Sequence, residues 1–121
     1  MSESEQQRFA ENHAYASQFP ATAGQQQAAQ AQVRALEAGL QGLAGKSFDE
    51  GQLMAATTAA TGGNPGMVAV TAFIPGDPAG AALVVEGPMG SCIHGEIDGT
   101  QVTARVTGPI ADGGCVPAVG H

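Results

Sequence analysis

The chain has 121 residues, of which 43% are hydrophobic and none is tryptophan, and its formal net charge is −7 because 11 acidic residues outnumber 4 lysines and arginines. This length leaves room for one domain with a modest core. So few cations cannot form the basic cluster that nucleic acid or anionic lipid requires, so neither is an expected partner. No run approaches the roughly 20 apolar residues that cross a bilayer, so no membrane span is expected in this chain.

The residues before Gly62 are rich in helix formers, and they predict helices separated by short breaks. Residues 1–24 are expected to form a helical extension that frays or packs beside the next helix, with Pro20 ending its helical part. Residues 25–121 are expected to form a single α+β domain.

The second helical segment has one apolar stripe and an otherwise polar surface. The stripe is spaced i, i+3, i+7 and i+10 and consists of Val33, Leu36, Leu40 and Leu43. The glutamine-rich stretch before Val33 offers only alanine for packing, so the stripe is expected to matter from Val33 onward.

A third helix is predicted to begin at the sequence "SFDE", residues 47–50. Ser47 and Glu50 have the spacing of a capping box, in which each side chain accepts a hydrogen bond from the other residue's amide. The helix is expected to run to Thr61 and to stop at Gly62 and Gly63. Its acidic first turn suits the helix dipole and is not expected to be catalytic.

After Gly62 the chain carries short β-prone runs, separated by turns rich in proline and glycine. Asp98 and Gly99 are expected at the tip of a hairpin, with Ile97 opposite Thr100. One face of this hairpin is apolar and carries Ile93, Ile97, Val102, Ala104 and Val106. The other face is polar and carries Cys92, His94, Glu96, Gln101, Thr103 and Arg105.

This alternation predicts an antiparallel sheet with one buried face, which the helix with the leucine stripe would cover. The expected fold class is therefore α+β, with two layers: N-terminal helices packed on a C-terminal antiparallel sheet of about four short strands, held by one disulfide.

The two cysteines, Cys92 and Cys115, lie 23 positions apart on either side of this hairpin. A disulfide between them would close a loop of about 24 residues and stabilise the fold by roughly 3.5 kcal/mol, by restricting the unfolded chain. Small extracytoplasmic domains with limited cores commonly use such a bond. We therefore expect a structural disulfide.

Two other roles for the cysteines stay open. Cys92 and His94 point the same way on one strand, and with Cys115 and His121 they offer four ligands of the kind that zinc prefers, although the spacing matches no standard finger. Cys92 and His94 also form a possible catalytic pair, although neighbours on one strand face leave little room for a substrate.

The polar hairpin face brings together His94, Glu96 and Arg105, with Arg105 expected diagonal to His94. These three residues are candidates for contact with a small polar ligand. Ordinary cross-strand pairing on a solvated sheet face is the favoured explanation for them.

No motif for a nucleotide, a catalytic serine or a metalloprotease helix occurs in the chain, and no cofactor is expected. A small glycine-rich chain with few aromatic residues is also a poor candidate for an enzyme pocket.

The stretch "CIHGEIDGTQVTARVTGPIADGGCVP", residues 92–117, resembles the C-terminal modules of small secreted or membrane-anchored actinobacterial proteins of unknown function. The resemblance covers about a fifth of the chain and brings no activity. It implies an extracytoplasmic setting, with Cys92 and Cys115 paired.

Together these features predict a non-enzymatic extracytoplasmic domain that contacts another protein or the cell envelope. The chain contains no charged segment followed by an apolar signal core. Because the paired cysteines predict an oxidising setting, a signal or anchor is expected upstream of the chain. The alternative is a small metal-binding or thiol-redox protein that uses Cys92, His94 and Cys115. A homodimer joined through the N-terminal helices is also expected, because a helix rich in Gln and Ala covers little area and a four-stranded sheet has two edges to hide.

Overall fold

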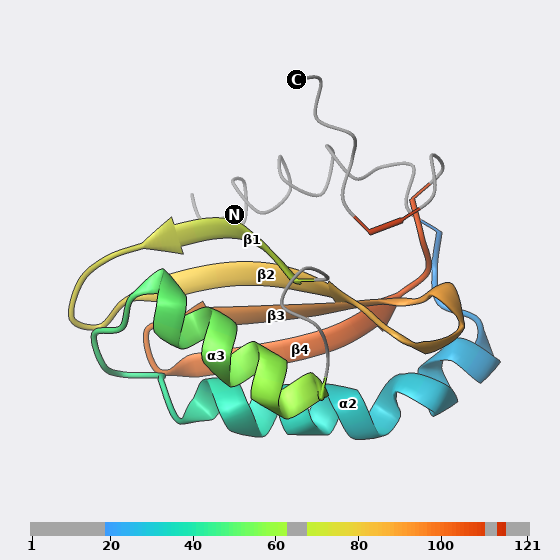
Figure 1. The fold of residues 1–121 in the computed structure, drawn as a ribbon, viewed down its shortest axis with the longest axis horizontal. Helices are drawn as coiled ribbons and strands as arrows, with labels where there is room; N and C mark the ends of the chain where they lie inside the picture. The colour runs from blue at the N-terminus through green and yellow to red at the C-terminus, as the bar shows by residue number, and fades with distance from the viewer. Residues whose placement is uncertain (1–18, 63–67, 111–113, 116–121) are drawn as a thin grey trace, which may run out of the picture.

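A computed structural model describes residues 19–62, 68–110 and 114–115, which fold into a layer of two helices packed against a four-stranded antiparallel sheet (Figure 1). The elements in chain order are α2 (Ala23–Gln41), α3 (Glu50–Thr61), β1 (Val68–Ile74), β2 (Gly80–Glu86), the 3-10 turn η2 (Pro88–Gly90), β3 (Cys92–Asp98) and β4 (Gln101–Thr107). The predicted two-layer α+β fold with one disulfide is confirmed. The predicted helix in the N-terminal extension lies outside the described residues, apart from its last positions.

Helix α2 begins at a capping box formed by Thr22 and Gln25, whose side chains each accept a hydrogen bond from the other residue's amide. Its predicted stripe is confirmed, because Leu36 and Leu40 are fully buried against the sheet. Ala29 is fully buried as well, so packing begins earlier in the helix than the large residues of the stripe suggest. At Ala29 the small alanine side chain is enough to pack this part of the helix into the core.

Helix α3 begins two residues later than the predicted cap. The N-cap is Asp49, which pairs with Gln52 in a capping box, and not Ser47 with Glu50. The reason is Phe48, which is buried in the core together with Leu53. These two residues flank the cap at the positions of a hydrophobic staple, so burying the phenylalanine fixes where the helix starts. The end at Thr61 is confirmed, with Gly62 in the left-handed conformation.

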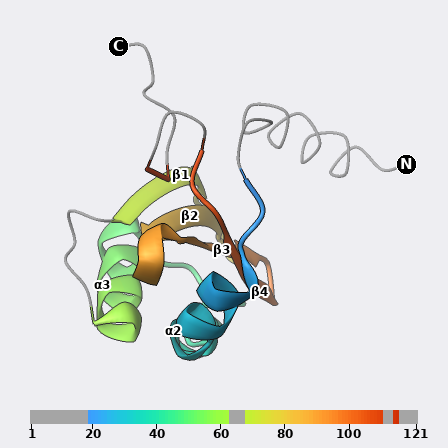
Figure 2. The same cartoon turned by 90° about the vertical axis from the view of Figure 1, so that its right-hand side faces the viewer.

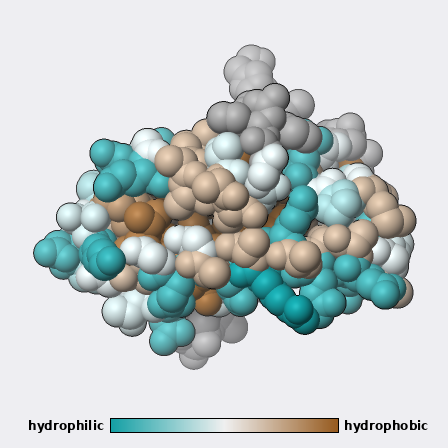
Figure 3. All heavy atoms as spheres, turned by 60° about the horizontal axis from the view of Figure 1, so that its bottom comes forward, coloured by the Kyte–Doolittle hydropathy of each residue, from teal (hydrophilic) through white to brown (hydrophobic). Residues whose placement is uncertain are grey.

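The sheet is a meander in the order β1-β2-β3-β4. Both helices lie on the same side of it, with α2 below β3 and β4 and α3 near β1 (Figure 2). The apolar residues of each strand face this helical layer, and we call the opposite side the outer face. Figure 3 views the helical side, where weakly apolar residues gather between hydrophilic flanks, as the alanine-rich sequence of α3 leads one to expect.

The register of the β3–β4 hairpin differs from the predicted one by two residues. Asp98 faces Gln101 and Ile97 faces Val102, so the turn consists of Gly99 and Thr100. Gly99 has a φ of 67°, and a glycine in the first loop position is one of the favoured two-residue hairpin turns. Because the offset is an even number of residues, every side chain stays on its predicted face.

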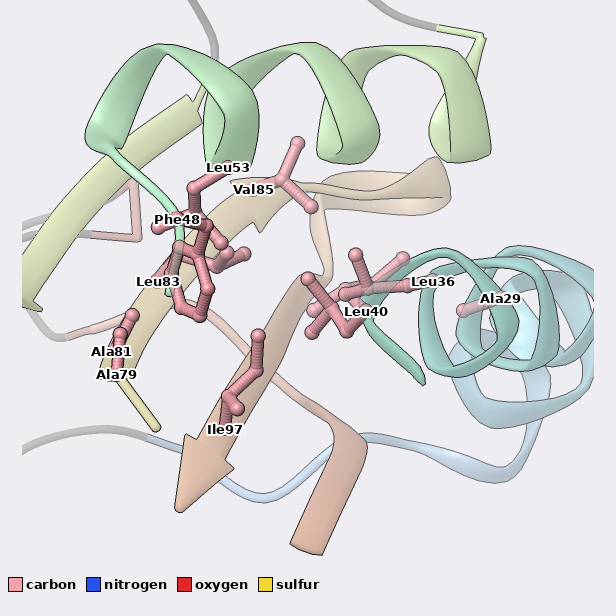
Figure 4. Close-up of a cluster of buried hydrophobic side chains, with 11 residues drawn as sticks. Ala29, Leu36, Leu40, Phe48, Leu53, Ala79, Ala81, Leu83, Val85 and Ile97 are labelled. Carbon is pink, nitrogen blue, oxygen red and sulfur yellow. The ribbon is translucent and has the colours of Figure 1, made fainter. Parts of the chain in front are cut away.

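The core lies between the two layers and contains residues from both helices and from the inner face of the sheet. In Figure 4, Leu36 and Leu40 project from α2 toward the sheet, while Phe48 and Leu53 reach it from the side of α3. Helix α2 packs closely on β3 at Gly95, where an added Cβ would lie 2.8 Å from Leu40 Cδ1. Glycine is needed at this position because the leucines occupy the space of its missing side chain.

The chain before α2 also joins the sheet. The amide of Phe19 donates to the Pro109 carbonyl at 2.9 Å, and the amide of Gly108 donates to the Phe19 carbonyl at 2.9 Å. The residues from Phe19 to the start of α2 at Ala23 therefore lie against the end of the sheet.

Leu40→Ala is expected to lower the free energy of unfolding by about 2–4 kcal/mol, because it removes a fully buried side chain and leaves a cavity. Denaturant unfolding measures this loss, with the exposed Gln41→Ala as the control. A change below about half a kcal/mol would show that α2 is not the cover of the sheet.

The contact of Leu40 with Gly95 predicts that the effects of Leu40→Ala and Gly95→Ala on stability are coupled. In the wild type, Gly95→Ala is expected to cost about 1–3 kcal/mol through overpacking. In the Leu40→Ala background the cost should fall, because the side chain that blocks the new Cβ is gone.

Candidate functional site

The candidate site lies on the outer face of the sheet, where alternation along β3 and β4 presents the polar residues. Cys92, His94 and Glu96 project to this face from β3, and the apolar residues between them project into the core. The predicted division of the hairpin into two faces is therefore correct. The outer face is the side away from the helices in Figure 2.

The candidate residues are close neighbours, with one change from the predicted arrangement. His94 lies directly opposite Arg105, not diagonal to it, because the register is shifted. Glu96 lies opposite Thr103, two pairs closer to the turn. The two strands thus bring His94, Glu96 and Arg105 together, with the opposite charges of Glu96 and Arg105 on adjacent strands.

His94 is half-buried and tied to the end of β4. Its Nε2 lies 2.9 Å from Thr107 Oγ1, and the Thr107 hydroxyl donates to the Gly108 carbonyl at 3.1 Å. The tautomer of His94 decides which of the two groups donates in the bond between them. Burial, together with the positive charge of Arg105, lowers the pKa of His94 from 6.5 to about 4. The imidazole is therefore neutral near pH 7.

The two cysteines form the predicted disulfide, with a Cα–Cα distance of 5.5 Å. Both are buried: Cys92 is 0% and Cys115 is 7% exposed. They pack with Val84 and Ala69 in a small second cluster on the outer face. Cys115 therefore lies over β2 and β3. It covers part of the outer face, which would otherwise be exposed to solvent.

The pairing also bears on the other roles considered for the cysteines. A sulfur in a disulfide is not a thiolate, which is the form that binds zinc or attacks a substrate. In residues 19–62, 68–110 and 114–115 no three His, Cys, Asp or Glu side chains are grouped so that they could hold a metal ion. His121, one of the four possible zinc ligands, lies outside the described residues.

A groove of about 440 Å³ lies beside the site, between α2 and β4, and no pattern in the sequence indicates it. It is lined by Ala23, Gln26, Gln27, Gln30, Val33, Arg105 and Val106. In the sequence, the glutamines of α2 have the pattern of an ordinary solvated helix face. The alternation along β4 does not indicate that the edge of this strand runs alongside the helix. Arg105 alone belongs to both the outer face and the groove.

No protein-family model, no curated protein and no solved structure matches this chain. The described part of the chain also contains no helix with the length and hydropathy that crossing a bilayer demands. The resemblance of residues 92–117 to actinobacterial modules stays a prediction.

Replacing both cysteines, as Cys92→Ala with Cys115→Ala, is expected to lower the free energy of unfolding by roughly 3.5 kcal/mol, because the unfolded chain is no longer closed into a loop. The melting temperature should fall by roughly 10–15 °C. Calorimetry with and without reductant measures both effects. Reductant should destabilise the wild type and leave the double variant unchanged; equal melting temperatures for all four samples would contradict a structural disulfide.

The lowered pKa of His94 predicts a pH dependence of stability. The unfolded imidazole gains its proton near pH 6.5 and the folded one only near pH 4, so the contribution is complete above about pH 6.5 and is lost as the pH falls toward 4. On this partly solvated face we expect a loss of about 1–2 kcal/mol. Urea unfolding at pH 7.5 and pH 4.5 measures it. His94→Gln, which cannot titrate, should lose less stability, and an equal loss in both proteins would contradict the assignment.

Proposed function

We propose that the chain is a non-catalytic extracytoplasmic domain whose outer sheet face contacts another protein or a component of the cell envelope. The observation that carries this proposal is the buried disulfide between Cys92 and Cys115. Bonds of this kind form and persist in oxidising compartments and are rare in the cytosol.

The small size of the core supports a structural role for the disulfide. Three of the eleven buried residues in the main cluster are alanines, which bury little area, and Phe48 is the single aromatic residue among the eleven. A domain with a core of this size gains a large share of its stability from a covalent link, since typical stabilities are only about 5–15 kcal/mol. A domain that needs this link would be poorly suited to a reducing compartment.

The proposed contact residues are His94, Glu96 and Arg105. They lie on two adjacent strands and offer a neutral imidazole, a carboxylate and a guanidinium within one small area. Regular strands hold these groups in place, which favours recognition of a polar partner. The net charge of −7 disfavours anionic lipid and points to a protein or an uncharged envelope component.

The alternative is the metal-binding or thiol-redox protein that uses Cys92, His94 and Cys115, and it requires reduced, accessible thiols. Within the described residues both sulfurs are buried in an apolar cluster with Val84, where an attacking thiol has little access. This burial favours the structural role.

The proposal is tested by the state of the cysteines in the native cell. Thiols are trapped with a maleimide under denaturing conditions at harvest, and the alkylated cysteines are counted by mass spectrometry in each cell fraction. We expect no alkylation before reduction, two alkylated cysteines after it, and recovery of the protein outside the cytosol. The Cys92→Ala with Cys115→Ala variant controls for labelling at other sites.

Two alkylated cysteines without reduction, in a cytosolic fraction with bound zinc, would overturn the proposal and support the alternative. The contact residues are tested separately with Glu96→Gln and Arg105→Gln, which remove charge from the face. Both variants should bind the envelope fraction more weakly than a matched Glu37→Gln variant on the exposed surface of α2.

A further inference from the structure

The two edges of the sheet differ in how they are protected. Strand β1 has a bulge between Val70 and Ala72, which interrupts its pairing with β2. Strand β4 pairs with β3 in an unbroken register over all seven residues, from Gln101 to Thr107. Bulges discourage the addition of another strand, whereas a regular edge invites it. The edge of β4 is therefore the one open to a further strand.

The backbone groups that point away from β3 can be assigned from the chain before α2. The amide of Gly108 donates to the Phe19 carbonyl, so it faces away from the sheet. Because alternate residues of a strand direct their amides to the same side, those of Val102, Ala104 and Val106 also face outward. Nothing in the described part of the chain hydrogen bonds to these three residues along the free edge.

We propose that two copies of this chain pair antiparallel through β4 and form a continuous sheet across a two-fold axis at Ala104. Phe19 occupies the edge at Gly108, so the free stretch runs from Val102 to Val106 and its midpoint is Ala104. A two-fold axis at this residue pairs Val102 with the partner's Val106 and satisfies all the outward-facing groups. Equal contacts on both copies are what a two-fold interface requires.

The charges on the outer face suit this register. Thr103 would lie opposite the partner's Arg105, so no like charges face each other directly. Glu96 lies on the next strand beyond Thr103, and neighbouring strands are about 4.8 Å apart. The long arginine side chain can extend over the short threonine toward that carboxylate. Each copy thus supplies a cation to an acidic position of the other.

The groove between α2 and β4 also permits a second copy to approach the free edge of β4. It lies directly beside the free edge, and its lining from α2 consists of alanine, glutamine and valine without a carboxylate. The chain as a whole has a net charge of −7, so two copies repel each other over much of their surface. The groove has no carboxylate in its lining from α2, so this repulsion is weaker there. The leucine stripe of α2 is buried against its own sheet, so these leucines are not part of an interface between copies.

Sedimentation velocity over a range from about 10 µM to 1 mM tests the proposal. An interface of one short strand pair falls at the low end of specific interfaces, so we expect a concentration-dependent dimer of the 12.0 kDa chain. Thr103→Arg should weaken the dimer about tenfold, because two pairs of arginines then face each other across the axis. Thr103→Glu, opposite the partner's Arg105, should dimerise at least as tightly as the wild type.

Thr71→Arg is the matched control, since it adds the same charge to an exposed position of the other edge strand. It should dimerise like the wild type. The double variant of Thr103→Arg with Arg105→Glu should recover dimerisation, because opposite charges again face each other. If Thr103→Arg melts early, Arg105→Glu takes its place, since it directs a carboxylate toward the partner's Glu96.

A wild-type protein that stays monomeric at 1 mM would overturn the proposal. So would a dimer that Thr103→Arg leaves unchanged, or one that Thr71→Arg weakens as much. These results do not depend on the compartment or on the state of the cysteines, so this inference and the proposed function can fail separately.

Discussion

The contact between α2 and β3 at Gly95 sets the spacing of the two layers, and the other packing follows from it. Leu36 and Leu40 fill the place of the absent side chain, so the helix lies closer to the sheet than a larger residue would allow. This close approach lets a helix made largely of alanine and glutamine cover the inner face. Helix α3, with its staple of Phe48 and Leu53, then covers the strands that α2 does not reach.

On the outer face the disulfide covers part of the sheet, as a second layer of helices would do in a larger protein. Cys115 covers Cys92 and Val84, and this small cluster shields one end of the sheet from water. His94 lies next to the cluster, half-buried and bound to Thr107, which explains why its imidazole stays neutral. The polar residues nearer the turn remain accessible. The outer face is thus divided between a covalently held end and an open polar end.

The fold was predictable because its signals are local and periodic. The stripe at Leu36 and Leu40 and the alternation around Ile93 each specify which side of an element is buried. The disulfide followed from the cysteine count. Two details were not predictable from local patterns alone: the cap of α3 depends on burying Phe48, and the hairpin register depends on which glycine conformation the turn adopts. Both are settled by tertiary packing.

The site was predictable in composition but not in arrangement. His94, Glu96 and Arg105 were expected on one face and lie there, yet the direct pairing of His94 with Arg105 needed the true register. The groove beside β4 depends on where α2 lies relative to the sheet edge, which no pattern along one strand encodes. The hydrogen bonds of Phe19 with Gly108 and Pro109 show which backbone groups of β4 point away from β3, and the sequence alone does not indicate these bonds.

The position of the disulfide also determines how the domain would carry mechanical load. Tension applied between Phe19 and Cys115 follows the covalent path, and at Cys115 that path crosses the sulfur–sulfur bond directly to Cys92. The residues between the two cysteines, including all of β4, lie outside this path. They span 23 positions, so roughly 75 Å of extended chain stays locked while the bond is intact. A stretched domain would therefore release α2, α3, β1 and β2 as slack, but the segment that holds the β3–β4 hairpin could not lengthen the chain until the bond is reduced.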